Sequence, residues 1–151
     1  MVKSAECWVK LGTWDRMRDW ATPIRMQVFV LEQRVAPQEE LDDMDVACLH
    51  AVAFDAQGRA QGTGRLLPDG HIGRMAVLRE FRGLGIGSAI LDMLVNEARG
   101  LGYHSVALHA QTHARGFYER HGFVAEGDEF EEANIPHILM RRSFEAPDRE
   151  T

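Results

Sequence analysis

The sequence is poor in cysteine and in lysine, and it contains no long apolar run. Its two cysteines, Cys7 and Cys48, form no C-x-x-C pair, so we expect reduced thiols in a cytoplasmic protein rather than a disulfide framework. No apolar run approaches the ~18 residues of a membrane-spanning helix. Residues 1–14 lack the apolar core of a secretory signal, so we expect no association with a membrane.

Positive charge is also scarce, with a formal net charge of −6 at pH 7. Without a basic stripe to neutralise phosphates, nucleic-acid binding is disfavoured. Seven histidines raise the question of a metal site. His109 and His113 fall at a strand end and in a loop rather than on one helical face, so we expect no metal.

The remaining composition is typical of an ordinary globular protein. The chain has 151 residues, of which 45% are hydrophobic and 26% charged, and it has no repeat or interdomain linker. A chain of this length buries about 68–70% of its unfolded surface. We therefore expect a single domain over residues 1–151.

Glycine gathers in one turn, Arg82-Gly83-Leu84-Gly85-Ile86-Gly87-Ser88, between an apolar strand-like run and an amphipathic helical pattern. A glycine-dense turn that opens a helix presents backbone N–H groups and the positive end of the helix dipole to one point. Such a turn suits phosphate, and Arg82 adds a positive side chain. The structural alternative is a helix entry that glycine makes tight.

The spacing separates three kinds of phosphate loop. A Walker A loop ends in Gly-Lys-Ser/Thr, but both lysines, Lys3 and Lys10, lie far away. A dinucleotide loop reads G-x-G-x-x-G, with an acid about 20 residues later. Here the spacing is G-x-G-x-G, and the next strand-like run ends in Gln111 without an acid. A nucleotide-binding oxidoreductase is therefore disfavoured, and the remaining pattern is R-x-x-G-x-G.

This pattern resembles the pyrophosphate loop of the GNAT superfamily, the acetyl-coenzyme A-dependent N-acetyltransferases. Arg74-Met75-Ala76-Val77 is similar to the family's central strand, whose backbone pairs with the pantetheine arm. Residues 111–123 are similar to the second signature, N-x-x-A-x-x-(apolar)-Tyr, a short helix and Gly-Phe. Gln111 departs from the usual Asn.

The resemblance implies roles for these residues. Tyr118 would donate a proton to the leaving thiolate, although it could instead pack its ring in the core. The strand, the loop and the second signature would contact the acetyl-coenzyme A cosubstrate through Met75, Ala76, Val77, Arg82, Gly83, Leu84, Gly85, Ile86, Gly87, Ser88, Gln111, Ala114 and Phe117.

Residues 28–33, 40–50 and 135–137 resemble the ElaA-like branch of the superfamily. Glu32 and His137 are candidates for the base, or its water relay, that deprotonates the acceptor amine. His137 could equally be a hydrogen-bonded core histidine, and we expect His71, beside a turn, to be exposed and inert. Residues 32–45 and 126–132 are rich in acids. They are either solvated loops or, in part, the mouth of an acceptor site that attracts cationic amines.

The hydrophobic pattern predicts an α/β fold. A helix is expected from Thr22 as N-cap and Pro23 at N1, with an apolar stripe of Ile24, Val28 and Leu31. A second helix is expected over residues 88–99. Strands are expected at residues 6–11, 49–54, 60–67, 71–78, 105–110 and 137–144. The sum is a mixed, mostly antiparallel sheet of six to seven strands flanked by helices, and the resemblance adds that its two central strands splay apart.

The predicted function is transfer of acetyl from acetyl-coenzyme A to an amine acceptor, small molecule or protein, with a preference for cationic amines. The alternative is a non-catalytic acyl-coenzyme A-binding sensor of the same fold. Apolar faces at the sheet edges would also allow a homodimer.

Overall fold

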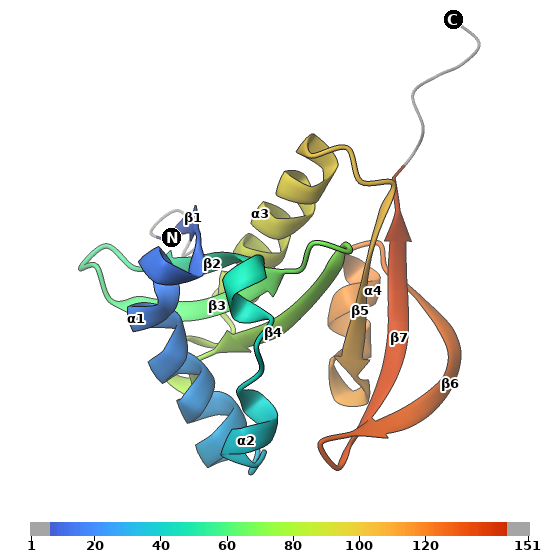
Figure 1. Ribbon diagram of the computed structural model, residues 1–151, viewed down its shortest axis with the longest axis horizontal. Coiled ribbons are helices and arrows are strands. Elements are labelled where there is room, and N and C mark those ends of the chain that lie inside the picture. The colour runs from blue at the N-terminus through green and yellow to red at the C-terminus, as the bar shows by residue number, and fades with distance from the viewer. Residues whose placement is uncertain (1–6, 145–151) are drawn as a thin grey trace, which may run out of the picture.

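The computed structural model describes residues 7–144, and seven strands in that range form one sheet. Its spatial order is β1-β2-β3-β4-β5-β7-β6 (Figure 1). Neighbouring strands are antiparallel, except for β4 and β5, which run parallel. The strands are β1 (Trp8–Gly12), β2 (Leu49–Phe54), β3 (Ala60–Leu66), β4 (His71–Val77), β5 (Ser105–Gln111), β6 (Val124–Glu132) and β7 (Ile135–Ser143). The predicted mixed, mostly antiparallel sheet is confirmed.

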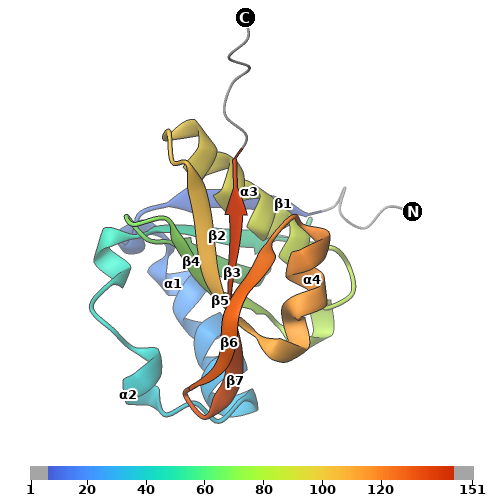
Figure 2. The same cartoon turned by 90° about the vertical axis from the view of Figure 1, so that its right-hand side faces the viewer.

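Helices cover both faces of this sheet (Figures 1 and 2). Successive residues of a strand point to opposite faces. Accordingly, Val52 and Phe54 of β2 pack with α1, whereas Ala51 and Ala53 join the large cluster that includes α3. The helical segments are α1 (Trp14–Arg25), η2 (Met26–Glu32), α2 (Pro37–Glu40), η3 (Asp45–Ala47), η4 (Arg79–Phe81), α3 (Ile86–Gly100), η5 (Thr112–Ala114) and α4 (Arg115–Arg120).

Strands β4 and β5 diverge soon after they meet, as Figure 1 shows. Their pairing extends over His71–Ala107 and Ile72–Leu108. Just beyond, the register between β3 and β4 shifts, so that two residues of β4, Arg74 and Met75, lie opposite Gly64 of β3. Such a β-bulge bends its strand and increases the local twist. The predicted splay between the central strands is therefore confirmed.

The first helix begins nine residues earlier than predicted. α1 starts at Trp14, so Thr22 is not its N-cap and Pro23 lies inside it. Proline removes a backbone donor and crowds the preceding turn. This cost is tolerated here because the helix packs against β2 and β3, and tertiary packing overrides local preference.

The apolar stripe of the first helix was also predicted wrongly at its end. α1 continues as the π-helix η2, in which Gln33 N–H donates to Val28 O, five residues back, at 3.0 Å. A π-turn holds more residues than an α-turn, so the face presented by each later residue changes. Ile24 and Val28 are buried, as predicted, whereas Leu31 is 64% exposed.

The acidic segment 126–132 is part of strand β6 rather than a loop. β6 lies at the edge of the sheet, and most of its residues are exposed. Charged residues on an edge strand discourage pairing with other chains, which explains why the segment lacks the apolar alternation of a strand. At the other end of the chain, Glu6 of the first predicted strand lies outside the described residues.

Candidate active site

A cavity of about 960 Å³ opens where β4 leaves β5. Its walls come from η2, β4, β5, α4 and the turn between β6 and β7. The three predicted catalytic residues, Glu32, Tyr118 and His137, all line it. Glu32 thus meets two residues at this site, Tyr118 and His137, that follow it by 86 and 105 positions in the sequence.

The glycine loop lies at the start of α3. Gly83 and Gly85 have φ angles of +80° and +83°, and Gly85 is the N-cap of the helix. These left-handed conformations favour glycine. The first N–H groups of an α-helix have no intrahelical partner, so the loop offers them to an anion.

The apolar side chains of this loop pack in the core. Ile86 is buried and Leu84 packs against the same core. Ser88 Oγ lies 2.9 Å from His121 Nε2. A Cβ at Gly87 would stand 3.5 Å from the ring of Phe117. Toward a phosphate, the loop can thus offer its backbone amides and, at its end, the Ser88 hydroxyl.

Arg82 joins the glycine loop to the π-helix. Its Nη1 and Nη2 donate to the two carboxylate oxygens of Glu32 at 2.7 and 2.8 Å, and its Nε donates to Val77 O at 2.9 Å. Hydrogen bonds from Arg82 lower the pKa of the Glu32 carboxyl. A carboxylate held in this way is a weak base, which disfavours the role predicted for Glu32.

Tyr118 lies on α4 with its ring in the core. It packs edge-on against Phe117 and Phe123, with ring centroids 5.0 and 6.0 Å away. Burial raises the pKa of Tyr118 to about 12. The phenol is therefore protonated at neutral pH and can donate a proton or a hydrogen bond toward the cavity that it lines.

His137 lies on β7 and is only 6% exposed. Its Nδ1 is 2.7 Å from Ile135 O. Because a carbonyl oxygen only accepts, Nδ1 carries the proton, and in the neutral ring Nε2 keeps its lone pair. The ring also stacks on Phe130. His137 thus has both properties that the sequence left open, since it is a hydrogen-bonded buried histidine and its imidazole lines the cavity.

Gln111 is held by a neighbour from the π-helix. The side-chain amides of Gln111 and Gln33 exchange hydrogen bonds at 2.9 and 3.3 Å, and His113 Nε2 lies 2.7 Å from Gln111 Oε1. The amide that stands at the family's asparagine position is therefore engaged within the protein. Sequence patterns gave no sign of Gln33 as its partner, because the two residues are 78 positions apart.

The predicted cosubstrate residues fall into two groups. Met75, Ala76, Val77, Arg82, Gln111 and Ala114 line the cavity. The others, which are the loop residues 83–88 and Phe117, lie beyond its lining. This division matches a long ligand that reaches from the cavity to the α3 N-terminus.

The comparisons with known proteins agree with this geometry. The profile described as "Acetyltransferase (GNAT) domain" matches residues 21–144. YjcF of Bacillus subtilis, described as an uncharacterized N-acetyltransferase, is 37% identical over 132 residues, which cover 85% of this chain and 93% of that protein. This chain is a GNAT acetyltransferase.

Solved structures share the whole fold. An acyl-CoA N-acyltransferase from Pseudomonas aeruginosa is 30% identical, with a TM-score of 0.78, over 91% of this chain and 99% of that chain. Escherichia coli ElaA, at 24% identity and a TM-score of 0.80 over 91% and 99% of the two chains, shares the fold. Membership of the family makes acyl-coenzyme A the cosubstrate and an amine the acceptor. A more specific place in the ElaA-like branch stays a prediction.

Two carboxylate–imidazole pairs were missed in the sequence of this acetyltransferase. His71 Nδ1 lies 3.1 Å from Asp69 Oδ1, and His109 Nδ1 lies 2.8 Å from Glu132 Oε1. The two rings meet edge to face at 5.8 Å, and all four residues line the cavity. His71, which we expected to be exposed and inert, has a side chain that is 39% exposed and lies in the cavity wall.

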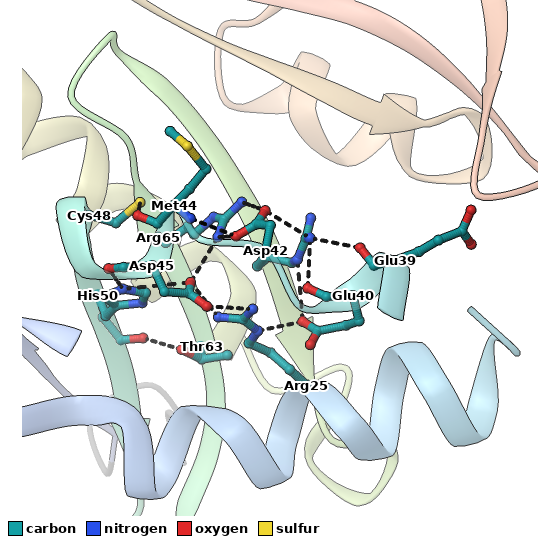
Figure 3. A network of polar contacts seen from close by, with 12 residues as sticks. Arg25, Glu39, Glu40, Asp42, Met44, Asp45, Cys48, His50, Thr63 and Arg65 are labelled. Atoms are coloured by element: carbon teal, nitrogen blue, oxygen red, sulfur yellow. Dashed lines mark hydrogen bonds and ion pairs between the residues drawn. The ribbon is translucent and has the colours of Figure 1, made fainter. Parts of the chain in front are cut away.

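Among the acids of residues 32–45, Glu40, Asp42 and Asp45 belong to a network with arginines, whereas Glu32 and Glu39 line the cavity. Arg25, Glu40 and Asp45 are 2%, 3% and 4% exposed. Arg25 donates to Glu40 at 2.6 Å and to both oxygens of Asp45 at 2.8 and 3.1 Å, while Arg65 binds Asp42 and Asp45 (Figure 3). Burial opposes ionisation, but the hydrogen bonds from Arg25 and Arg65 lower the pKa of Asp45. These carboxylates fasten residues 40–45 to α1 and β3.

Two further properties concern residues 7–144 alone. No group of three or more His, Cys, Asp or Glu side chains in this range is arranged to hold a metal ion. None of the helices in the same range is long and apolar enough to cross a membrane.

Proposed function

We propose that this protein transfers an acetyl group from acetyl-coenzyme A to a primary amine that carries additional positive charge. One observation supports the proposal above others. A single cavity connects the edge of β4 with the phenol of Tyr118 and the imidazole of His137. Acyl transfer to an amine needs a proton acceptor for the amine and benefits from a proton donor for the thiolate.

The proposed roles follow from the state of each group. His137 Nε2, directly or through a water, removes a proton from the acceptor ammonium. The neutral amine attacks the thioester carbonyl carbon, and the C–N bond forms. The nitrogen then releases its second proton to solvent, and the C–S bond breaks. Tyr118 supplies a proton to the departing thiolate and regains one from solvent. The backbone of residues 75–77 would orient the thioester, and the amides of residues 83–88 would hold the pyrophosphate.

The charge of the cavity supports a cationic acceptor. Its three arginines already have carboxylate partners: Arg82 pairs with Glu32, and Arg65 and Arg74 with Asp42. Asp69 and Glu132 instead face imidazoles. The remaining field is therefore negative, and a negatively charged cleft attracts cationic substrates most strongly at low salt.

A matched pair of acceptors tests the proposal. 1,4-Diaminobutane and 4-aminobutanoate share a primary amine and a chain of similar length, but one ends in an ammonium and the other in a carboxylate. With acetyl-coenzyme A and detection of free thiol, we expect kcat/KM to be about tenfold higher for the diamine and to decline as salt rises. Glu132→Gln should narrow this preference, whereas Glu126→Gln, which removes a surface carboxylate paired with Arg141, should not.

The possible failures are distinct. Preferred turnover of 4-aminobutanoate would refute the cationic acceptor while leaving the transferase intact. Tight binding of acetyl-coenzyme A without turnover of any amine in a broad library would instead favour the acyl-coenzyme A sensor.

A further inference from the structure

Arg74 occupies a backbone conformation that its side chain disfavours. Its φ angle is +52°, and among the four non-glycine residues with positive φ in the described range it is the one inside a strand. Glycine would adopt this conformation without steric cost. A non-glycine residue persists in such a place where the surrounding contacts fix it.

The side chain of Arg74 makes those contacts with the segment that follows the π-helix. Its Nη2 donates to Glu40 O at 2.8 Å, to Asp42 Oδ2 at 3.2 Å and to Glu39 O at 3.3 Å. Its Nε lies 3.3 Å from Glu40 Oε2, as an ion pair. Figure 3 shows how Glu39, Glu40 and Asp42 follow one another along this segment. Arg74 therefore ties β4 to residues 39–42.

The two carboxylates that Arg74 contacts already have other arginine partners. Glu40 already receives Arg25 at 2.6 Å, and Asp42 already receives Arg65 at 2.8 Å. Burial, and then the positive charge of nearby Arg65, lower the pKa of Arg74. Asp42 and Glu40 act in the opposite direction, so burial and Arg65 offset part of what the ion pairs of Arg74 contribute. The other effect of these contacts is to hold residues 39–42 against β4.

Arg74 lies in the bulge of β4, at the point where β4 diverges from β5. The bulge fits because residue 64 on β3 is glycine, where a Cβ would stand 2.6 Å from Met75 Sδ and 3.0 Å from Ile90 Cγ2. Met75 therefore points toward α3, while Arg74 reaches the segment on the other face. Directly after the bulge, Ala76 and Val77 line the cavity, as does Glu39 from the tied segment.

We propose that Arg74 is a positioning residue for acyl transfer, which fastens residues 39–42, whose Glu39 lines the cavity, to the bulge of the strand that would present the thioester. This inference rests on the function proposed above. Arg74 would then keep Glu39, on the cavity wall, at a fixed position relative to the part of β4 that orients the thioester. A displacement of about 1 Å between reacting groups can lower a rate by up to about 100-fold.

The conformation of Arg74 makes a clean variant available. Arg74→Gly removes the guanidinium and relieves the backbone, so we expect a folded protein with nearly unchanged affinity for coenzyme A by calorimetry. Amide hydrogen exchange of residues 39–42 should become about tenfold faster or more. With 1,4-diaminobutane as probe, kcat/KM should fall about 10- to 100-fold. Arg74→Lys, which keeps a charged donor, should restore part of both properties.

Two controls separate positioning from general stability. Arg74→Ala loses the same contacts but keeps the strained backbone, so it should melt at a lower temperature than Arg74→Gly. Arg141→Ala removes an arginine whose partner, Glu126, lies outside the cavity, and it should leave exchange at residues 39–42 and turnover unchanged.

The inference is overturned if Arg74→Gly exchanges at residues 39–42 as slowly as the wild type, or if coenzyme A affinity falls as much as turnover. The exchange measurement needs no acceptor. Faster exchange in a protein whose wild type acetylates no amine would therefore support the clamp and refute the proposed function.

Discussion

Tyr118→Phe removes one hydroxyl and leaves the ring in place against Phe117 and Phe123. The variant should fold, with a change in unfolding free energy of about 1 kcal/mol or less. Coenzyme A affinity should also stay nearly constant, because the cosubstrate contacts predicted for the second signature are Gln111, Ala114 and Phe117 and not the Tyr118 hydroxyl. The change therefore isolates the proposed proton donor.

The size of the effect follows from the acidity of the phenol. Burial raises the pKa of Tyr118 to about 12, whereas an ordinary thiol has a pKa of about 8.5. Proton transfer from Tyr118 to the thiolate is then uphill, so the proton is only partly transferred in the transition state, and the transfer is completed as Tyr118 regains a proton from solvent. General acids typically contribute about 10²–10⁴-fold. We expect the low end here, a fall in kcat of about 10- to 100-fold, equivalent to about 1.4–2.8 kcal/mol.

Single-turnover release of free thiol measures the effect where chemistry limits the rate. The defect should shrink with an acyl donor whose thiol is more acidic, because that leaving group needs less help. Wild-type kcat should show no basic limb from Tyr118 below about pH 11, since the phenol titrates at about 12. In single-turnover measurements, a Tyr118→Phe protein that keeps the wild-type rate would show that the tyrosine only packs.

Three further predictions concern the loop and the charge network. Gly85→Val should abolish coenzyme A binding in calorimetry, because residue 85 has a φ of +83° and a side chain would stand where backbone must approach phosphate. The control Gly87→Ala, whose Cβ would meet Phe117 at 3.5 Å, should bind coenzyme A normally. Equal binding by the two variants would refute the assignment of this loop as the phosphate site. Arg25→Met leaves the buried carboxylates of Glu40 and Asp45 without their main partner. It should lower the free energy of unfolding, measured in urea, by about 3–5 kcal/mol, and a loss under about 1 kcal/mol would contradict this reasoning. Hydrogen bonds from Arg65 lower the pKa of Asp42 to about 2. The ionised Asp42 carboxylate therefore stabilises the fold fully above its pKa in the unfolded chain, about 4, and this stabilisation is lost as pH falls through about 2. Asp42→Asn should lower the free energy of unfolding by up to about 2 kcal/mol at neutral pH and by less at pH 2.

The fold was predictable wherever local sequence and final environment agree. Alternation and buried runs marked most strands, and the glycine loop marked the entry to α3. The π-helix was not predictable, because its apolar residues fit a regular 3.6-residue stripe and only packing reveals that Leu31 turns outward. Strand β6 escaped for a different reason, since an exposed edge strand buries neither face and has no apolar rhythm to detect.

The candidate site was predictable in its local motifs and not in its long-range pairs. Tyr118 and Gln111 belong to one signature, and His137 to another short segment, and the fold brings them to one cavity. Glu32 looked like a free base because its partner Arg82 is 50 positions away. Arg74 stood within the recognised strand motif, but no pattern in one sequence reveals its positive φ.

The charge that an acceptor meets also depends on long-range pairs that only the fold reveals. Along the sequence, residues 32–45 and 126–132 are rich in acids, and some of these were predicted to line an acceptor mouth for cationic amines. In the fold, Glu40, Asp42 and Asp45 face Arg25, Arg65 and Arg74, so that these carboxylates and guanidinium groups largely cancel. The preference for a cationic amine therefore depends on Asp69 and Glu132, at the other side of the cavity, whose partners are imidazoles rather than arginines. Acceptor selectivity should respond to substitutions on this β4–β5–β6 wall, whereas substitutions in the arginine network should change stability and the placement of residues 39–42.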